Sequence, residues 1–436
     1  MKSIVTAATL LLLPLFSAFA FDTQFSFSVS TDFTTPLPYA KRAGELLQAD
    51  LKGDAEFYLY ANDKTTFFAN GQLVLDMLRS QSDSFDLGPA GTFVGVTLKE
   101  AWLDYTSDCW AARVGRQICS WGKADVISVT NVLCPRNYSS FNIFTMTDSL
   151  LGIDAARFSL KYDVYSLDFY WVPIVRASAI PTDPNHFVQK TLSESTELGF
   201  IQLGKIKTPD PKFENFEYGL KASAYWKYAD VSLYAFYGWD KFPGSFKLDM
   251  VKLTSDLRRM TMFGADASIP LGAVVLRLEG AFFPYSAMPI IPQSLEMEEY
   301  VRNGFSLEFG YKERNRLKML AGLDWMPGGW ILSAQYYGDL AFGDMEELNR
   351  KNYMHFATLV VSKSFFKDIL TLSLASLVQL EEWNNAFVLN AAVKASDSLS
   401  FSAALYCVNL FEDFKQDTLN EFRNWGGATI GAKYSF

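Results

Sequence analysis

The sequence predicts an all-β protein, a transmembrane antiparallel β-barrel of about 18 strands (16–20) preceded by a cleaved signal peptide. Three observations predict this fold. Apolar and polar side chains alternate along most of the chain, charged residues recur on the polar side of the strands, and the chain ends on an aromatic residue within such an alternation. Charges on one face of so many strands would be costly in a dry sandwich core, whereas a water-filled lumen accommodates them.

The first 20 residues predict a secretory signal peptide. Lys2 supplies a positive charge, residues 4–16 are apolar, and Ala18-Phe19-Ala20 forms a small-x-small cleavage site. Beyond it, no apolar run reaches the length of about 18 residues that a membrane-spanning helix needs. Only a closed sheet satisfies its backbone hydrogen bonds in lipid. We therefore expect residues 21–436 to form one barrel in the outer membrane of a diderm bacterium, in contact with its lipid.

The composition agrees with this class. Aromatic residues make up 16% of the chain and hydrophobic residues 49%, which fits aromatic girdles at both rims of a barrel. The formal net charge of −9 argues against a nucleic-acid partner, because nucleic-acid-binding proteins need a basic surface.

Strands alternate with connections of two lengths. The clearest alternation occurs in residues 23–30, 55–61, 167–171, 217–227 and 274–282. Tight links rich in Asn, Asp, Pro or Gly occur at residues 61–64, 106–109, 161–164, 228–230, 269–272, 326–329, 366–368 and 395–398. Longer connections cover roughly 32–49, 79–95, 119–150, 176–213, 241–257, 284–315, 341–352 and 411–423. Short periplasmic turns and long external loops are the expected asymmetry.

Two further stretches carry a strand pattern. Residues 198–203 and 305–311 would break the parity of the barrel if each counted as one spanning strand, so we assign them to loops. A barrel of about 18 strands leaves an aqueous channel rather than a filled core.

The last strand is the expected assembly signal. Tyr434 and Phe436 share an apolar face with Ile430, while the intervening residues are small or polar. This ending resembles the carboxy-terminal signal that the barrel-assembly machinery reads, so that machinery is an expected partner.

Residues 113–137 resemble outer-membrane porin-like families that carry G-R-Q, then W-G-x-x-D, then a Pro-Arg pair. The matching residues are Gly115, Arg116, Gln117, Trp121, Gly122, Asp125, Pro135 and Arg136. The families are uncharacterised proteobacterial large-barrel proteins and, more distantly, alginate-export barrels. The resemblance implies an eighteen-strand barrel, a loop at about 119–150 folded into or over the lumen, and passive diffusion as the activity. Such families usually have an Asp near Asn131 and no cysteines here, so their ligand contacts do not carry over.

The same stretch supplies the candidate constriction. The residues are Arg113, Arg116, Gln117, Trp121, Lys123, Asp125 and Arg136. They could hold an inward loop by charge-assisted hydrogen bonds, or line a narrow point where solutes meet fixed charge. By alternation Arg113 points inward, whereas Arg116 has the opposite parity near the rim.

The expected lumen lining has balanced charge. Inward basic candidates are Arg113, Arg157, Lys161, Lys221, Arg277 and Lys318, and inward acidic candidates are Glu100, Asp168, Glu217, Asp266, Glu279 and Asp324. A balanced lining predicts weakly selective passage of small hydrophilic or zwitterionic solutes.

The chain has four cysteines, Cys109, Cys119, Cys134 and Cys407. Cys119 and Cys134 lie in the same predicted loop and could form a disulfide in an oxidising compartment. The two histidines, His186 and His355, are distant from the cysteines in sequence, so neither a metal site nor a cofactor is expected.

Other functions remain as alternatives. No Ser-His-carboxylate grouping emerges, so an enzyme is not expected. A transporter or binder of hydrophobic compounds usually carries an amino-terminal hatch, whereas strand alternation here begins at Phe21. An adhesin would depend on aromatic loop residues at 141–144 and 242–246. The sequence leaves the oligomeric state open.

Overall fold

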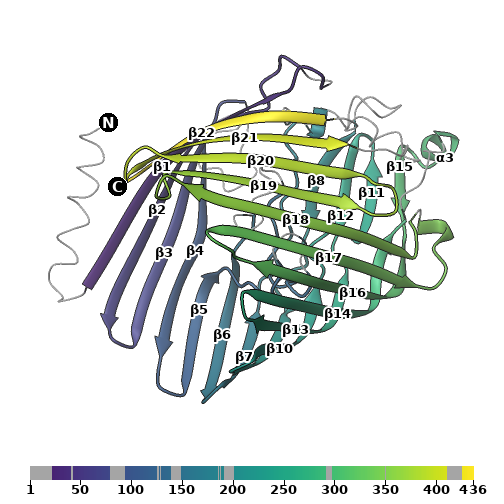
Figure 1. Ribbon diagram of the computed structural model, residues 1–436. Coiled ribbons are helices and arrows are strands. Elements are labelled where there is room, and N and C mark those ends of the chain that lie inside the picture. Colours follow the sequence, from purple (N-terminus) through teal and green to yellow (C-terminus); the bar gives the residue numbers. More distant parts are fainter. Residues whose placement is uncertain are drawn as a thin grey trace.

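The structure is a computed structural model that describes residues 22–40, 43–78, 94–124, 127, 129–138, 149–184, 186, 188–190, 201–290, 297–348, 350–409 and 425–436. The predicted signal peptide at 1–20 lies outside these residues and stays a prediction. In the described part of the chain, 18 strands form one sheet, and each pairs antiparallel with its neighbours (Figure 1). They are β1 (Asp22–Pro36), β2 (Gln48–Asn62), β3 (Thr65–Asp76), β4 (Val94–Thr106), β5 (Trp110–Gln117), β6 (Ile153–Tyr162), β7 (Tyr165–Val172), β9 (Glu217–Trp226), β10 (Ala229–Trp239), β13 (Arg259–Leu271), β14 (Val274–Pro289), β16 (Tyr311–Trp325), β17 (Trp330–Phe342), β18 (Tyr353–Phe365), β19 (Leu370–Gln379), β20 (Asn385–Lys394), β21 (Leu399–Asn409) and β22 (Trp425–Ser435).

The first and last strands close this sheet into a barrel. β1 pairs with β2 on one edge and with β22 on the other, with Phe33 opposite Ile430. The backbone N–H of Phe436 donates to the carbonyl of Phe27 at 2.8 Å, and their rings lie 5.6 Å apart. The predicted closed antiparallel barrel of 18 strands is therefore confirmed.

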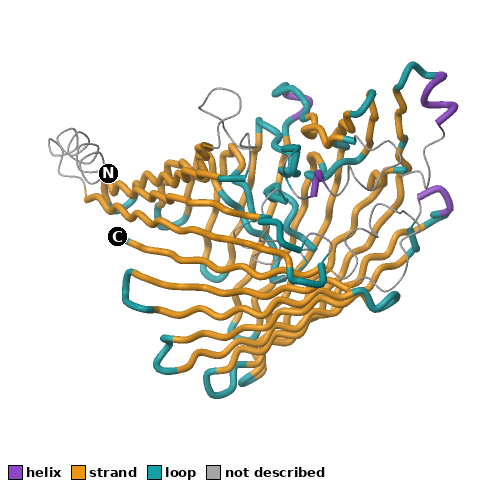
Figure 2. Tube along the Cα trace, turned by 90° about the horizontal axis from the view of Figure 1, so that it is seen from above, coloured by secondary structure: helices purple, strands orange, loops and turns teal. Residues whose placement is uncertain are grey.

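The two faces of the barrel wall differ as the alternation predicts. On β10, Leu233 is 59% exposed and Tyr237 50% exposed, while Tyr234 and Phe236 between them are buried. The outward apolar residues form a band larger than the apolar patches that water-soluble proteins expose. We therefore assign the outer face to lipid. The connections are short at one end and long at the other (Figure 2). None of the helices in the described part of the chain is long and apolar enough to cross a membrane.

A second, smaller sheet lies in the long connections. Its strands are β8 (Gln202–Lys207), β11 (Ser245–Asp249), β12 (Lys252–Asp256) and β15 (Ser306–Phe309), in the order β15-β11-β12-β8. The helix α3 (Met297–Arg302) precedes β15, and the short helices η1 (Phe213–Asn215) and η2 (Glu346–Leu348) lie in other loops. Leu248 and Leu307 pack with Tyr300 in the core of this sheet.

This small sheet corrects the loop assignment of residues 198–203 and 305–311. They do not span the barrel, as expected, but part of each is a strand, β8 and β15. Residues 198–200 lie outside the described part of the chain. Short apolar segments from three loops bury their side chains only by pairing with one another, and a single-chain period does not reveal such partners.

Candidate functional site

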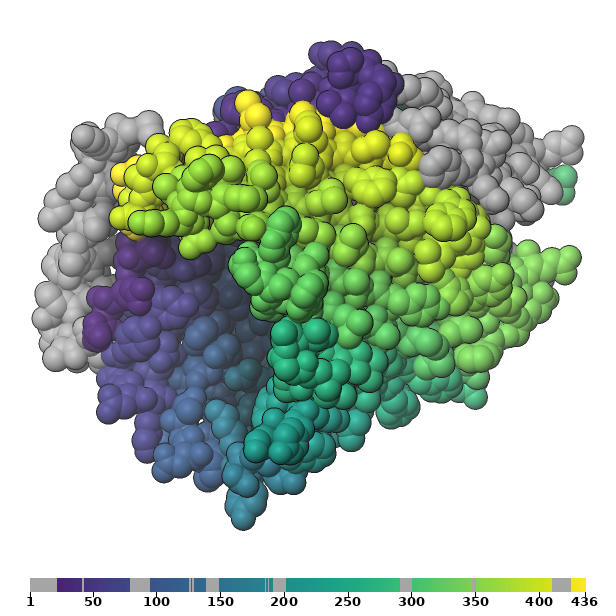
Figure 3. All heavy atoms as spheres, viewed as in Figure 1, coloured from purple at the N-terminus to yellow at the C-terminus, as the bar shows by residue number. Residues whose placement is uncertain are grey.

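A segment that follows β5 lies inside the barrel. We call residues 118–138 the inward segment; 118–124, 127 and 129–138 of it are described. Trp121 and Leu133 are buried in one cluster with the inward-facing Tyr234, Met262 and Phe283 of the wall. Wall residues of this cluster come from β6 to β17, so the inward segment packs on that side of the lumen. In the space-filling view the molecule is hollowed beside the purple and blue strands that follow β1 (Figure 3).

Glu279 anchors the inward segment from the wall. Its Oε1 accepts hydrogen bonds from the backbone N–H groups of Lys123 and of Ala124, the latter at 2.6 Å. Its Oε2 accepts a hydrogen bond from the Thr130 hydroxyl at 3.3 Å. Successive N–H groups converging on one carboxylate form an anion-binding concavity.

Gly122 allows the backbone of the inward segment to lie close to the Glu279 carboxylate. Its φ is +86°, and a Cβ at this position would lie 2.6 Å from Oε1 of Glu279 and 2.5 Å from Oγ1 of Thr130. Only glycine fits a left-handed backbone pressed against a carboxylate. The glycine of the W-G motif therefore has a physical reason in the structure.

Trp121 supplies the apolar part of the anchor. Its ring lies 5.0 Å from the ring of Tyr234 and 5.6 Å, edge-on, from that of Tyr170. A Cβ on Gly219 would come within 3.0 Å of the indole, so the wall is shaped to receive it. The Tyr234 hydroxyl accepts the Gly122 N–H at 3.2 Å and donates to Asp266. Aromatic pairs of this kind stabilise packing beyond the area they bury.

Arg277 adds a third anchor. Its guanidinium donates to the Lys123 carbonyl at 2.8 Å and pairs with the buried Asp324 at 2.5 Å. Arg277 and Glu279 both face inward, as expected of lining residues, but their described contacts hold the inward segment rather than leaving them free to meet solutes.

The residues at the end of β5 fasten the start of the segment. The side-chain amide of Gln117, only 1% exposed, donates to the Ala155 carbonyl at 2.9 Å. Glu100 accepts the backbone N–H of Ile118 at 2.7 Å. Glu100 was expected to line the pore, and here it holds the chain where it leaves the wall.

The two arginines of β5 point to opposite faces. Arg113 faces the lumen, where it pairs with Asp104 at 2.7 Å and stacks 3.8 Å over the Trp102 ring. Arg116 lies on the outward parity of β5 and pairs with Asp154 of β6 at 2.9 Å. Arg116 therefore joins two wall strands, and among the described residues it makes no hydrogen bond to the inward segment.

The remaining candidates are dispersed. Lys161 is exposed at the end of β6, and Arg157 lies opposite Arg113 across the β5–β6 pair. Lys221 lies opposite Asp168, with its ammonium 5.7 Å from the Tyr234 ring. Asp125 lies outside the described residues.

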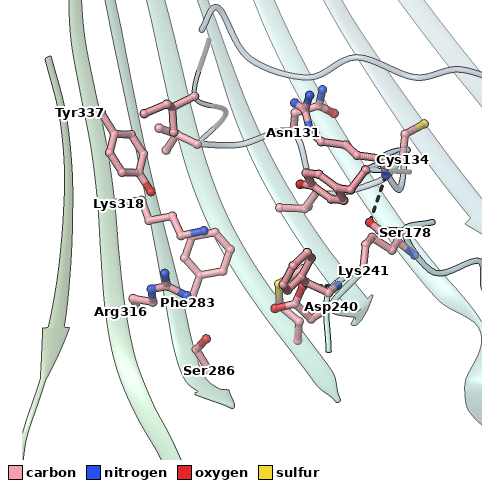
Figure 4. Close-up of a pocket in the computed structure, with 17 residues that line it drawn as sticks. Asn131, Cys134, Ser178, Asp240, Lys241, Phe283, Ser286, Arg316, Lys318 and Tyr337 are labelled. Atoms are coloured by element: carbon pink, nitrogen blue, oxygen red, sulfur yellow. Dashed lines mark hydrogen bonds between the residues drawn. The ribbon is translucent and has the colours of Figure 1, made fainter. Parts of the chain in front are cut away.

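A cavity of about 310 Å³ lies between the inward segment and the wall. Four of its lining side chains are cationic, Arg136, Lys241, Arg316 and Lys318, and one is acidic, Asp240. Figure 4 shows Asn131, Cys134, Asp240 and Lys241 on one side, and Phe283, Arg316, Lys318 and Tyr337 facing them. Two candidates from the inward segment, Cys134 and Arg136, line this space. The backbone N–H of Arg136 also donates to the Ser178 hydroxyl at 3.1 Å.

These cations differ in how they are neutralised. Lys241 pairs with the fully buried Glu217 at 2.6 Å. Arg316 pairs with Asp339, and Arg350 lies 3.6 Å from the same carboxylate. The Lys318 ammonium lies 4.8 Å from the Phe283 ring centre, and among the described residues no carboxylate is within ion-pair distance of it. Of Lys241, Arg316 and Lys318, Lys318 is therefore the one without an ion-pair partner among the described residues.

Sequence reasoning missed two of these cations. Arg316 has the same parity on β16 as Lys318, so the period of two that identified Lys318 could also have identified Arg316. Lys241 follows β10 in a loop, and no periodic signal points to it.

Cys119 and Cys134 are free thiols here, and both are buried. The Cys119 backbone N–H donates to Sγ of Cys134 at 3.1 Å. A side-chain hydrogen bond to Cys134, together with burial, raises the pKa of the Cys119 thiol well above its ordinary value. The same contact, aided by the Cys119 N–H and the Lys241 charge, lowers the pKa of Cys134. The disulfide between them stays a prediction.

Fold and site together define a large membrane-type β-barrel with an anchored inward segment. The chain is similar to solved outer-membrane porin structures over nearly its whole length. OccK8 (OprE) of Pseudomonas aeruginosa is 9% identical with a TM-score of 0.53, covering 95% of this chain and 98% of that one. OccAB3 of Acinetobacter baumannii is 11% identical with a TM-score of 0.51, covering 95% and 99%. The P. aeruginosa outer membrane protein OpdK is 6% identical with a TM-score of 0.52, covering 95% and 99%.

At these identities the likeness shows the fold alone. No family model matches the sequence, and no curated protein matches it. The motif resemblance at residues 113–137 and the relation to alginate-export barrels stay predictions.

Proposed function

We propose that this protein is an outer-membrane channel through which small hydrophilic solutes diffuse passively, with the inward segment as its constriction. Export by the predicted signal peptide and recognition of Tyr434 and Phe436 by the assembly machinery belong to the same proposal. The observation that carries it is an inward segment fixed to the inside of a barrel wide enough to hold water.

The way the inward segment is held supports a permanent constriction. Glu279 and Arg277 bind its backbone, and Trp121 packs into the wall. Backbone contacts hold a loop whatever side chains it presents, so the segment narrows the lumen while its side chains remain available to select solutes.

The cavity beside the segment supports hydrophilic solutes. Lys318, which has no carboxylate within ion-pair distance among the described residues, would have to lose water against a hydrophobic compound without a compensating partner. This lining disfavours the alternative of a hydrophobic transporter. The same residue offers ion pairing to a solute, not an activated nucleophile beside a base, so we propose a channel rather than an enzyme.

Charge balance at the cavity differs from that of the whole lumen. The full inward lining mixes acids and bases, which predicts weak selectivity. At the cavity, the Lys318 ammonium has no carboxylate within ion-pair distance among the described residues. We infer that solutes carrying a negative group are favoured at this point, because a fixed charge acts most strongly where solutes shed water.

Planar-bilayer recordings of the purified protein test the proposal. We expect an ohmic conductance and a reversal potential shifted toward anions. Removing residues 120–133 and joining the ends with a short Gly-Ser linker should raise conductance, on the order of twofold. A silent protein, or equal conductance with and without the segment, would contradict the proposal.

Lys318→Gln tests the selectivity part, with Lys318→Arg as its matched control. Loss of one uncompensated cation should reduce anion preference in the glutamine variant and preserve it in the arginine variant. Equal reversal potentials for the two variants would remove Lys318 from the selectivity determinant.

A further inference from the structure

Two buried thiols bracket the inward segment at its base. Cys119 lies two residues after the end of β5, and Cys134 immediately precedes Pro135, whose carbonyl accepts the N–H of Leu151 just before β6. Residues 120–133, which carry Trp121 and the backbone groups bound to Glu279, lie between them. A bond between the two sulfur atoms would therefore link the two stems of the inward segment.

The thiols are in contact but not equivalent. The Cys119 N–H reaches Sγ of Cys134 at 3.1 Å, so the sulfur atom of Cys134 sits at the base of the other stem. Cys134 lines the cavity, whereas Cys119 does not and is 6% exposed (Figure 4). The Cys119 Sγ lies 3.9 Å from the Gln117 side-chain oxygen, on the wall side.

The surroundings favour Cys134 as the reactive sulfur. Its Sγ accepts a backbone N–H, and the positive charge of Lys241 acts on it. Both effects stabilise a thiolate, the form that attacks disulfides, whereas Cys119 stays protonated beside it.

We propose that Cys134 is a thiol–disulfide exchange site that opens on the cavity, with Cys119 as its resolving thiol, and that the resulting bridge closes the inward segment into a covalent ring. The oxidant is a small disulfide that enters the lumen, such as oxidised glutathione.

The chemistry proceeds in two exchange steps. The Cys134 thiolate attacks one sulfur of the small disulfide, a mixed disulfide forms, and one small thiolate leaves and takes up a proton. Cys119 then loses its proton and attacks Sγ of Cys134, which releases the second small thiol. Two protein thiols are oxidised, one disulfide is reduced to two thiols, and no other electron acceptor is needed.

The consequence for the channel rests on the proposed function. With free thiols the segment is held only by noncovalent contacts such as those of Glu279 and Trp121. With the bridge, residues 120–133 lie in a short covalent loop whose conformational freedom is reduced. We expect open-channel current fluctuations to be smaller in the bridged form.

Intact-mass measurement tests the chemistry directly, in the folded full-length protein in detergent. The background carries Cys109→Ser and Cys407→Ser, so that only the two thiols of interest count. After incubation with oxidised glutathione, this protein should lose the mass of two hydrogens and show a peptide linking Cys119 to Cys134. Protein already bridged when purified should show the same peptide, and reduction should restore two alkylatable thiols.

Single-cysteine variants separate the two roles. Cys119→Ser should retain one glutathione on Cys134, because the resolving thiol is absent, while Cys134→Ser should remain unmodified. Free thiols throughout in the background protein, or modification of Cys134→Ser at the rate seen for Cys119→Ser, would overturn the assignment. The linked peptide is measured on a chain with both thiols intact, so it does not depend on how the serine variants fold.

The mass readout is independent of conductance. A protein that forms the bridge but is silent in bilayers would contradict the proposed function and support the exchange site. A conducting protein that never forms the bridge would do the reverse.

Discussion

Two parts of the barrel wall share the same alternation but present different inner faces. From β6 to β17 the inward residues are large or charged, for example Tyr234, Phe283 and Glu279, and they are covered by the inward segment. From β18 to β22 many inward residues are small or hydroxylated, such as Ser362, opposite Ser373, and Thr429, and the large ones, Tyr406 and Trp425, form a separate cluster. The comparison teaches that large inward side chains provide the surface on which a segment can pack, so the inward segment lies against the part of the wall that supplies most of them.

The largest expected effect is the loss of the aromatic anchor. Trp121→Ala removes the contacts with Tyr170 and Tyr234, and burial of this kind is worth about 3–5 kcal/mol. We expect a higher and noisier conductance, because the inward segment would be held less firmly against the wall. Bilayer recordings check this, with Trp383→Ala, an exposed tryptophan outside the strands, as the control. Unchanged conductance would mean that the segment does not depend on its aromatic contact.

Neutralising Glu279, whose carboxylate accepts backbone hydrogen bonds from the inward segment, should have the next largest effect. Glu279→Gln keeps the size of the side chain but replaces one of the two acceptor oxygens by a donor, and hydrogen bonds to a charged group are worth about 1.5–3 kcal/mol. We expect conductance to rise less than in Trp121→Ala. If recordings of Glu279→Gln match the parent protein, the charge is not what holds the segment.

Two glycines give a sharper test of the same contact. Gly122→Ala places a Cβ 2.6 Å from the Glu279 carboxylate, and such overpacking costs about 1–3 kcal/mol. Gly280→Ala is the matched control, because a Cβ there meets nothing within 4 Å and the residue adjoins Glu279 in sequence. Thermal unfolding in detergent should show a lower midpoint only for Gly122→Ala. Equal midpoints would argue that the close approach relaxes without cost.

The smallest effect is expected on the outer side of the wall. Arg116→Ala removes a partly exposed pair with Asp154, and such pairs contribute about 0–1 kcal/mol. Because Arg116 has no described contact with the inward segment, conductance and ion preference should match the parent channel. A changed reversal potential would show that Arg116 acts on the lumen after all.

The parity of individual residues explains how far prediction from sequence reached. Arg277 and Glu279 were predicted to face inward, and they do, because a period of two fixes the face of a strand residue. Their role as anchors could not be predicted, because their partners lie in the inward segment, more than 150 positions away for Lys123. The W-G motif was noticed, but its reason is the carboxylate of Glu279.

The small sheet shows what a local strand pattern leaves undetermined. Residues 305–311 carried a strand pattern, and part of them is the strand β15. Its partner β11 lies in another loop, and the backbone hydrogen bonds of each strand depend on that pairing. Local pattern could suggest the strand but not the sheet to which it belongs.

The sequence by itself determined that apolar and polar side chains alternate along the strands, and therefore which side chains face outward, that about 18 strands close the barrel, and that an aromatic residue follows the last strand. Tertiary structure alone decided which residues meet across the lumen: Lys241 with Glu217, Lys318 beside Phe283, and Cys119 against Cys134. The physical reason is that alternation is a local property of each strand, whereas a cavity depends on distances between strands that only the closed sheet sets.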